Sequence, residues 1–200
     1  MYVIGLTGGI ACGKSEVSRR LQERGLPVVD ADVVARELVE PGQPLLEKLA
    51  EIFGDGVLRA DGSLDRKRLG SLVFADRDLL EQLNALMHPA IWKECLRRLG
   101  ELRDKCPAAV LVAPLLYEHG GEAFADTVWV VACSEEMQLQ RLRERDHLTE
   151  EQAKSRLRAQ MPIAKKIELA DHVIPNEGTL EELEREIDCA MEILQGVPGN

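Results

Sequence analysis

The segment Gly8–Ser15 limits what this chain can fold into more than any other. It fits the pattern G-x-x-x-x-G-K-[ST] and directly follows the apolar run 2–7, which predicts a strand. In such a loop the backbone N–H groups turn inward around an anion, and the following helix adds the positive end of its dipole. We expect Lys14 to reach the outer phosphates of a nucleotide and the Ser15 hydroxyl to ligate Mg²⁺.

The middle of this loop holds Ala11 and Cys12, where a loop wrapped around phosphate often uses glycine to allow a positive φ. The pattern requires glycine at neither position. The Cys12 thiol should lie beside the anion, where the helix dipole lowers its pKa and a bound phosphate raises it. The alternative, which we favour, is that Cys12 is a small space-filling residue without a chemical role.

Composition indicates one globular α/β unit over 1–200. The 200 residues are 45% apolar and 30% charged, and the longest apolar run, 108–117, is too short to span a membrane and contains Pro114. No charged-then-apolar leader precedes the loop. The five cysteines are odd in number and form no C-x-x-C pair, so we expect neither a disulfide framework nor a zinc site. These features predict a soluble, cytoplasmic protein without a membrane partner.

The charge distribution favours a local anion site. A net charge of −10 argues against a general nucleic-acid binder. Segment 141–166 nevertheless carries eight basic residues against four acidic ones, a net of +4. The basic ones are Arg141, Arg143, Arg145, Lys154, Arg156, Arg158, Lys165 and Lys166. The segment is either a focused anion site or a pair of solvated helices with ordinary i,i+4 pairing.

The order of apolar patterns predicts a mainly parallel five-stranded sheet in a three-layer sandwich. After the helix to about Arg24, strands are expected at 26–29, 108–113, 127–132 and 172–176. Capping patterns Thr149-x-x-Gln152 and Thr179-x-x-Glu182 open two later helices, and Ser134 opens the one before them.

Between the second and third strands, residues 44–106 show helical spacing without a strand. Four groups of apolar residues, at 45–53, 69–73, 79–86 and 91–102, predict successive helices, and the turn residues 54–62 predict a turn or small hairpin. Sixty residues of helix exceed what a crossover requires, so 44–106 is expected to be an inserted subdomain.

A phosphate-binding loop alone does not name a reaction. A GTPase should show Asn-Lys-x-Asp, which is absent from the sequence, and a motor ATPase usually ends a buried strand on a carboxylate, whereas this strand ends Val112-Ala113-Pro114. A small kinase needs a carboxylate near the acceptor hydroxyl, an acceptor pocket and a mobile basic lid. Asp30 or Asp32, the 44–106 insertion and the 141–166 segment occur in that order.

The chain carries a set of short motifs that together resemble the dephospho-CoA kinase family of P-loop kinases. They are Gly5–Ile10 with Gly13–Ser15, Asp30–Asp32 with Ala35-Arg36, His88-Pro89, Pro114–Glu118, Gln138 with Arg141 and Arg145, and Gln160 with Lys166, Ala170-Asp171, Asn176 and Gly178. The chain departs from the family at Ala11-Cys12, where Gly-Ser is common, at Glu16, where Thr is common, and at Ala113, where an acidic residue sometimes stands.

The resemblance implies transfer of the γ-phosphoryl group of ATP to the ribose 3′-hydroxyl of dephospho-CoA, giving CoA and ADP, with Mg²⁺ as cofactor. It implies catalytic roles for Lys14, Asp32 and Arg141. It places ATP against Gly8, Gly9, Ala11, Cys12, Gly13, Lys14, Ser15, Glu16, Arg141 and Asn176, and the acceptor against Asp32, Arg36, His88, Tyr117 and Glu118, with Ser15 as the metal ligand. Asp32 would orient the acceptor hydroxyl more than deprotonate it, because a loose transition state asks little of a base.

Two alternatives stay open from sequence. Another small-molecule or nucleotide P-loop kinase would share every catalytic part and differ in the insertion. A regulatory protein would bind nucleotide without transferring phosphate. The sequence carries no signal for a protein partner.

Overall fold

The structure is a computed structural model and describes residues 1–195. The chain divides into two compact units, one made of Met1–Val29 with the chain from Arg98 onward, the other of Asp30–Arg97. The insertion expected over 44–106 falls largely in the second unit. We describe each unit by itself.

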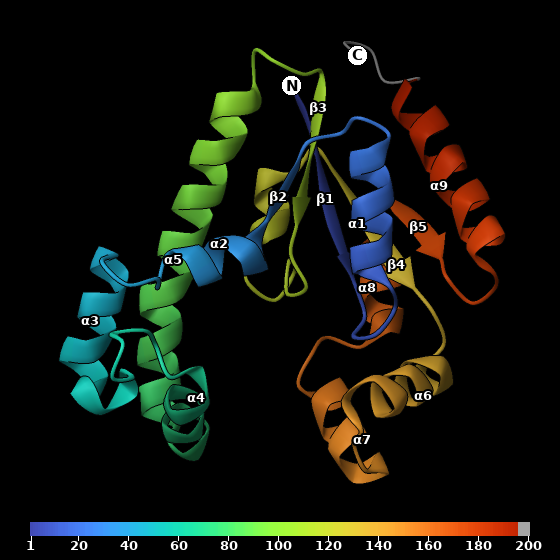
Figure 1. The fold of residues 1–200 in the computed structure, drawn as a ribbon. Coiled ribbons are helices and arrows are strands. Elements are labelled where there is room, and N and C mark those ends of the chain that lie inside the picture. Colours follow the sequence, from blue (N-terminus) through green and yellow to red (C-terminus); the bar gives the residue numbers. More distant parts are fainter. Residues whose placement is uncertain (196–200) are drawn as a thin grey trace. The chain divides into compact units, whose positions relative to one another are not determined.

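The first unit is built on the predicted sheet, which is confirmed. Its strands are β1 (Tyr2–Gly8), β2 (Val28–Asp30), β3 (Ala108–Val112), β4 (Thr127–Ala132) and β5 (His172–Pro175), in the order β2-β3-β1-β4-β5 (Figure 1). The pairs β1–β3, β1–β4 and β4–β5 are all parallel. Their shared direction brings Gly8, Val112 and Ala132 to the same edge of the sheet, the edge at which such folds bind ligands.

Both faces of β1 are covered. Ile4 and Leu6 are fully buried in the core that also contains Val17. Gly5, between them, faces the other way, because a β carbon there would meet Leu116 and Ala125 at 3.0 Å. Burial on both faces explains why the strands read as continuous apolar runs rather than as alternating ones.

Helices surround this sheet at α1 (Lys14–Glu23), α6 (Glu135–Asp146), α7 (Glu150–Arg158), α8 (Ile163–Leu169) and α9 (Leu180–Gln195), with a 3₁₀ turn, η2, at Gly121–Phe124. Both predicted capping boxes are present. Thr149 Oγ1 accepts from the Gln152 N–H at 3.3 Å, and Thr179 Oγ1 accepts from the Glu182 N–H at 3.2 Å. Ser134 is the N-cap of α6, as predicted, although its side chain makes no capping bond.

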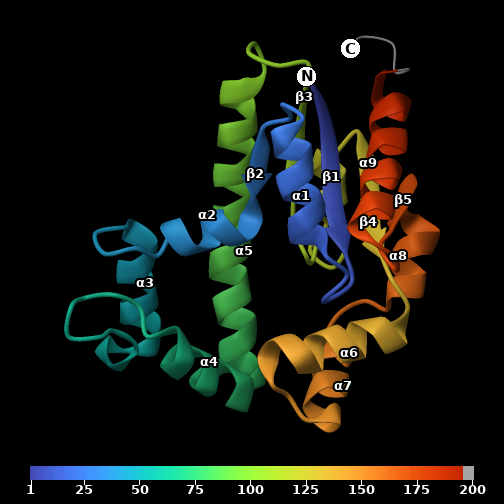
Figure 2. The same cartoon turned by 45° about the vertical axis from the view of Figure 1, so that its right-hand side comes forward.

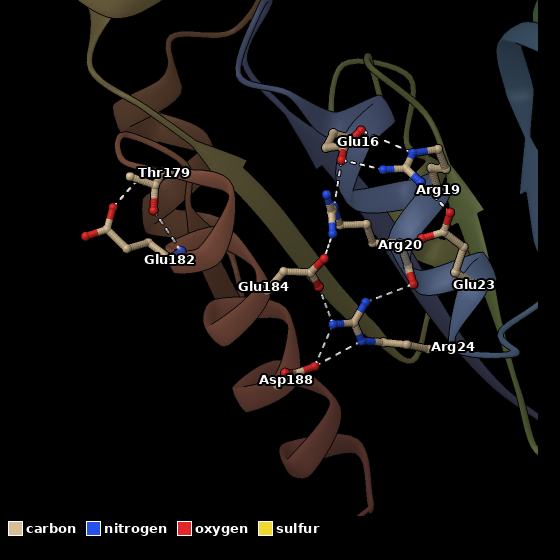
Figure 3. Close-up of polar contacts among 9 residues, drawn as sticks. All are labelled: Glu16, Arg19, Arg20, Glu23, Arg24, Thr179, Glu182, Glu184 and Asp188. Carbon is tan, nitrogen blue, oxygen red and sulfur yellow. Dashed lines mark hydrogen bonds and ion pairs between the residues drawn. The ribbon is translucent and has the colours of Figure 1, made fainter.

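Helices α1 and α9 lie side by side in both views (Figures 1 and 2). Figure 3 shows that ion pairs join them: Arg20 contacts Glu184, and Arg24 contacts both Glu184 and Asp188. Beneath these pairs, Leu183 and Ile187 of α9 join Val17 and Leu21 of α1 in the core. Burial of these apolar side chains, rather than the surface charges, dominates the packing energy.

Replacing Ile187 with alanine should therefore lower the free energy of unfolding by about 2–5 kcal/mol, the usual range for truncating a buried isoleucine. Its side chain is fully buried, whereas Ile193 on the same helix is 55% exposed. Ile193→Ala is the matched control and should cost less than about 0.5 kcal/mol in urea unfolding. Equal losses would contradict the packing of α9 described above.

The second unit is helical, with α2 (Ala31–Glu37), α3 (Pro44–Phe53), η1 (Asp55–Val57), α4 (Arg66–Ala75) and the start of α5 (Arg77–Leu102). It has its own apolar core, which includes Val39, Leu46, Leu49 and Val73. A bridge between Leu58 and Leu64 forms the small hairpin expected between α3 and α4.

One expectation for this unit was wrong. The sequence predicts two helices across 79–102, separated at His88-Pro89, but α5 runs unbroken through Pro89 (Figure 2). A proline inside a helix removes one backbone hydrogen bond and crowds the preceding turn. Leucines before Pro89 pack against the core of this unit together with Met87 and Ala90, next to the proline. This packing favours helix on both sides of the proline. It outweighs the local tendency of Pro89 to end a helix.

Candidate active site

The phosphate-binding loop joins β1 to α1. Gly13, the N-cap of α1, has φ +86°, and Ala11 has φ +59°, so both occupy the left-handed region. Alanine is rarely found there, which makes Ala11 a strained position held by its surroundings. The expected need for positive φ in the loop is thus confirmed at a residue that is not glycine.

Two side chains hold the loop in place. Gln138 of α6 donates from Nε2 to the Ile10 carbonyl at 2.9 Å, and Asn176, which follows β5, donates from Nδ2 to the Cys12 carbonyl at 2.8 Å. In a trans peptide the C=O and the next N–H point in opposite directions, and the described chain has no cis peptide. The N–H groups of Ala11 and Gly13 therefore point away from these two amides, into the loop, as an anion requires.

The glycines permit this close support. A β carbon on Gly13 would lie 2.2 Å from Asn176 Nδ2, and one on Gly9 would lie 2.0 Å from Gln138 Nε2. Both distances are shorter than any real contact, so neither position accepts a side chain without moving the amide that supports the loop.

The Cys12 side chain lies under the loop. It is fully buried, receives a hydrogen bond from Gln138 Nε2 at 3.1 Å, and its sulfur is 3.2 Å from that of Cys133, just after β4. The hydrogen bond to Cys133, together with burial, raises the pKa of the Cys12 thiol. The same hydrogen bond lowers the pKa of the Cys133 thiol, and the nearby Arg141 guanidinium lowers it further through its charge and hydrogen bonding. The Glu177 carboxylate raises this pKa.

Arg141 lies near Cys133, whose thiol pKa it lowers, and Cys133 in turn contacts Cys12 of the loop. Five of the eight basic residues in 141–166 have carboxylate partners: Arg145 and Arg156 pair with Asp146, Lys154 with Glu150, Lys165 with Glu168, and Lys166 with Glu118. Arg141 has no ion-pair partner among residues 1–195. Arg141 therefore differs from the five paired residues, and its effect on the Cys133 thiol distinguishes it from Arg143 and Arg158.

Helices α6 and α7 lie beyond the carboxyl ends of the strands, next to the loop, in both views (Figures 1 and 2). A cavity of about 400 Å³ opens there between Gly9 and Ile10 of the loop and Lys154 and Arg158 of α7. The Oε1 atom of Gln160, which also lines it, is buried without a hydrogen-bond partner. These residues fit the position expected of a basic lid.

Lys166 and Glu118 form a buried pair at the end of β3. Lys166 Nζ donates to the Pro114 carbonyl at 2.7 Å and lies 3.0 Å from Glu118 Oε1, which also accepts from the Met161 N–H at 2.9 Å. Glu118 Oε2 and Tyr117 Oη are buried and unpartnered. Burial and the Asp171 and Glu122 carboxylates raise the pKa of Tyr117 to about 12, so its hydroxyl stays protonated and can donate a hydrogen bond.

Replacing Lys166 with methionine should destabilise the fold by about 3–5 kcal/mol, because it leaves the Glu118 carboxylate with no countercharge in a buried setting. Lys165 is the adjacent control, since its side chain is 55% exposed against 0% for Lys166. Lys165→Met should cost less than about 0.5 kcal/mol. Thermal unfolding of both variants measures the difference, and a stable Lys166→Met protein would contradict the buried pair.

Ser15 and Glu16 lie in the first turn of α1. The Glu16 carboxylate binds Arg19 and Arg20, each at 2.6 Å, and these arginines lower its pKa (Figure 3). An ATP contact from this side chain stays a prediction. The Ser15 hydroxyl is exposed at the start of the helix and is a hard oxygen donor of the kind that Mg²⁺ accepts. Within residues 1–195, no three His, Cys, Asp or Glu side chains are grouped to hold a metal.

The second unit carries the other predicted residues. Asp30 is the N-cap of α2 and accepts from the N–H groups of Asp32 at 2.8 Å and Val33 at 3.4 Å. Asp30 therefore caps α2, and Asp32 lies within its first turn. Arg36 lies in the last turn of α2, and His88 lies within α5 rather than at a helix end.

Sequence reasoning missed what several residues do. Gln138 was recognised only as a family-type residue, and Lys166 was considered for the phosphate-facing side of the lid, whereas its Nζ donates to the Pro114 carbonyl. The ATP contact predicted for Asn176 stays a prediction, and the support that its amide gives the loop was not foreseen. Cys133 was not singled out at all. The only available signal was the position of Cys133 and Asn176 just after apolar strands, since those positions meet at one edge of a parallel sheet.

Comparison with known proteins adds independent information. The family model for dephospho-CoA kinase matches residues 2–182. The chain belongs to the dephospho-CoA kinase family. A dephospho-CoA kinase from Geobacter sulfurreducens is 48% identical over 189 residues, 94% of this chain and 96% of that one. One from Bacillus thuringiensis is 47% identical over 179 residues, 89% of this chain and 90% of that one.

Solved structures agree. Dephospho-CoA kinase from Campylobacter jejuni has a TM-score of 0.74 at 29% identity, covering 96% of both chains, and a Thermus thermophilus protein, TT1252, has 0.84 at 36% identity, covering 98% of both. Shikimate kinase from Acinetobacter baumannii, at 19% identity and a TM-score of 0.53 over 99% of this chain and 96% of its own, shows the fold alone. The P-loop kinase fold is confirmed. In residues 1–195, no helix has the length and apolarity needed to cross a membrane.

Proposed function

We propose that this protein transfers the γ-phosphoryl group of ATP to the ribose 3′-hydroxyl of dephospho-CoA, yielding CoA and ADP. The observation that carries the proposal is the loop itself: supported through its carbonyls by Gln138 and Asn176, it directs N–H groups inward at the start of α1. Family membership supports dephospho-CoA as the acceptor.

The mechanism follows from charge. The loop N–H groups and the α1 dipole bind the phosphates, and Lys14 neutralises charge on the outer ones. Arg141 supplies a planar fork for the equatorial oxygens of the transferring group. Mg²⁺, held by the ATP phosphates and the Ser15 hydroxyl, would neutralise developing charge on the β and γ oxygens. The exposed Ser15 oxygen fits that ion.

On the acceptor side we assign Asp32, Arg36, His88, Tyr117 and Glu118. Asp32 accepts the hydrogen bond of the 3′-hydroxyl and orients its oxygen for in-line attack. The unpartnered Tyr117 Oη and Glu118 Oε2 support the assignment, because buried polar atoms in folded proteins are nearly always satisfied by a partner, water or ligand. We assign residues 141–166 to the lid and the 44–106 insertion, which includes His88, to acceptor binding. A cytoplasmic location stays a prediction.

Turnover with different acceptors tests the proposal. With ATP and Mg²⁺, kcat/KM for dephospho-CoA should exceed that for AMP, CMP or shikimate by at least about 10²-fold, the scale of discrimination that a few lost polar contacts produce. A preference for a nucleoside monophosphate would favour another small kinase. Tight ATP binding without transfer to any acceptor would favour a regulatory protein.

Replacing Asp32 with asparagine should lower kcat by about 10²-fold or more and leave the KM for ATP within about threefold, because the change removes an acceptor charge without altering shape. Asp30→Asn is the paired variant. Asparagine caps a helix about as well as aspartate, so this change should alter stability by less than about 0.5 kcal/mol, and it should lower kcat far less than Asp32→Asn does. The opposite ranking of the two activities would identify Asp30 as the functional carboxylate.

A further inference from the structure

Two thiols meet directly beneath the phosphate-binding loop. Cys12 belongs to the loop and Cys133 follows β4, and their sulfurs are 3.2 Å apart, with 0% and 5% of the two residues exposed. Both lie in the same compact unit. Sequence analysis found no cysteine pairing, since the two residues are 121 positions apart in the chain.

The two sulfurs are in direct non-bonded contact. A disulfide is about 2.05 Å long, so the two sulfurs need to approach by only about 1 Å. Cys133 is anchored at the end of a central strand, whereas Cys12 lies in a loop. The loop side of the pair would supply most of the movement, next to Ala11, which already holds a strained φ of +59°.

The Cys133 side of the pair borders a surface cavity. Cys133 lines a surface cavity of about 320 Å³ between the end of β4 and α8, together with Ser134, Ile163 and Glu177. Hydrogen peroxide is only slightly larger than water, and such a cavity admits several water molecules.

We propose that Cys12 and Cys133 form a reversible disulfide that inactivates the phosphate-binding loop under oxidising conditions. The consequence for catalysis rests on the kinase function proposed above.

The chemistry balances with hydrogen peroxide as oxidant. The Cys133 thiolate, favoured by Arg141 and by the bond to Cys12, attacks one peroxide oxygen, giving a sulfenic acid and hydroxide. The Cys12 sulfur then attacks the sulfenic sulfur, the S–S bond forms, and the oxygen leaves as water with the Cys12 proton. Two thiols and one peroxide become one disulfide and two waters.

The disulfide should act on ATP binding and on kcat together. Drawing Cys12 toward Cys133 shifts the peptide whose carbonyl Asn176 holds at 2.8 Å and whose N–H, at Gly13, faces the phosphate. A misplacement of about 1 Å in a catalytic constellation costs on the order of 10²-fold in rate. We therefore expect at least a tenfold loss of activity and weaker ATP binding in the oxidised protein, reversed by dithiothreitol.

The test is peroxide titration of the full-length protein, read out in three ways. Trypsin with Glu-C digestion separates Cys12, Cys106 and Cys133 into different peptides, so mass spectrometry identifies a 12–133 crosslink directly. Binding of a fluorescent ATP analogue and dephospho-CoA kinase activity are measured on the same samples before and after dithiothreitol. Cys12→Ser and Cys133→Ser, each compared with its own reduced form, should lose the peroxide response.

Cys106→Ser with Cys189→Ser is the control, since neither of these cysteines contacts the pair, and it should keep both basal activity and the full response. Absence of the crosslink while Cys189 oxidises would overturn the proposal. So would a crosslink that leaves ATP-analogue binding unchanged. If the reduced protein binds ATP but does not phosphorylate dephospho-CoA, the proposed function fails, and the crosslink and binding measurements still decide the disulfide.

Discussion

Replacing Arg141 with alanine should lower kcat by about 10³-fold, within the range known for arginines that contact a transferring phosphoryl group. The chain has a net charge of −10 and must hold two polyanions close enough to react, so local positive charge has to offset the repulsion. Arg141 can do this because it lies beside the loop and has no carboxylate partner in the described chain, whereas Arg145 shares Asp146 with Arg156. Initial rates at saturating ATP and acceptor measure the effect.

Two companion variants separate this role from general surface charge. Arg141→Lys should recover little activity, because a point charge does not replace a planar fork. Arg143 lies two residues along α6, which places it on a different face of the helix, and it is exposed. Arg143→Ala should change kcat by less than about threefold, as expected for an exposed surface residue. Equal, small effects at 141 and 143 would mean that α6 presents only a solvated face.

Replacing Lys14 with methionine should lower kcat by at least about 10²-fold with the fold intact, because it removes a charge that follows the β and γ phosphates into the transition state. Lys14 begins α1, immediately after the left-handed Gly13, so its position is fixed by the loop. Circular dichroism and thermal unfolding establish that the variant is folded. Arg19→Met, in the exposed pair with Glu16 on the same helix, is the control and should keep near-normal turnover. Near-normal turnover by folded Lys14→Met would refute the assignment of the loop.

The sheet and the loop could be predicted from sequence because their signals are local. Apolar runs of strand length, a glycine pattern between strand and helix, and two capping boxes each depend on neighbouring residues, and the structure contains all of them. The helix through Pro89 was mispredicted because its continuity depends on contacts that are distant in the sequence. The residues that favour its continuity include Leu46 and Val73, which belong to other helices and are invisible to a local pattern.

The residues that hold the loop in place were harder to predict than the loop itself. Gln138, Asn176 and Cys133 act on the loop from 121 or more residues away in the chain, so their contacts depend on strand order, which a single sequence does not give. The pairing of charges in segment 141–166 also could not be predicted from the sequence. Counting predicted a net of +4, but only the three-dimensional pairing distinguishes Arg141 from five residues whose charge is already balanced.

The most direct measurement of the central claim is product analysis after incubation with ATP, Mg²⁺ and dephospho-CoA. Mass spectrometry and ³¹P NMR should show CoA bearing a new 3′-phosphate, formed in equal amount to ADP, and Lys14→Met should form both products at least about 10²-fold more slowly. ADP without CoA, or phosphate on another hydroxyl of the acceptor, would contradict the account.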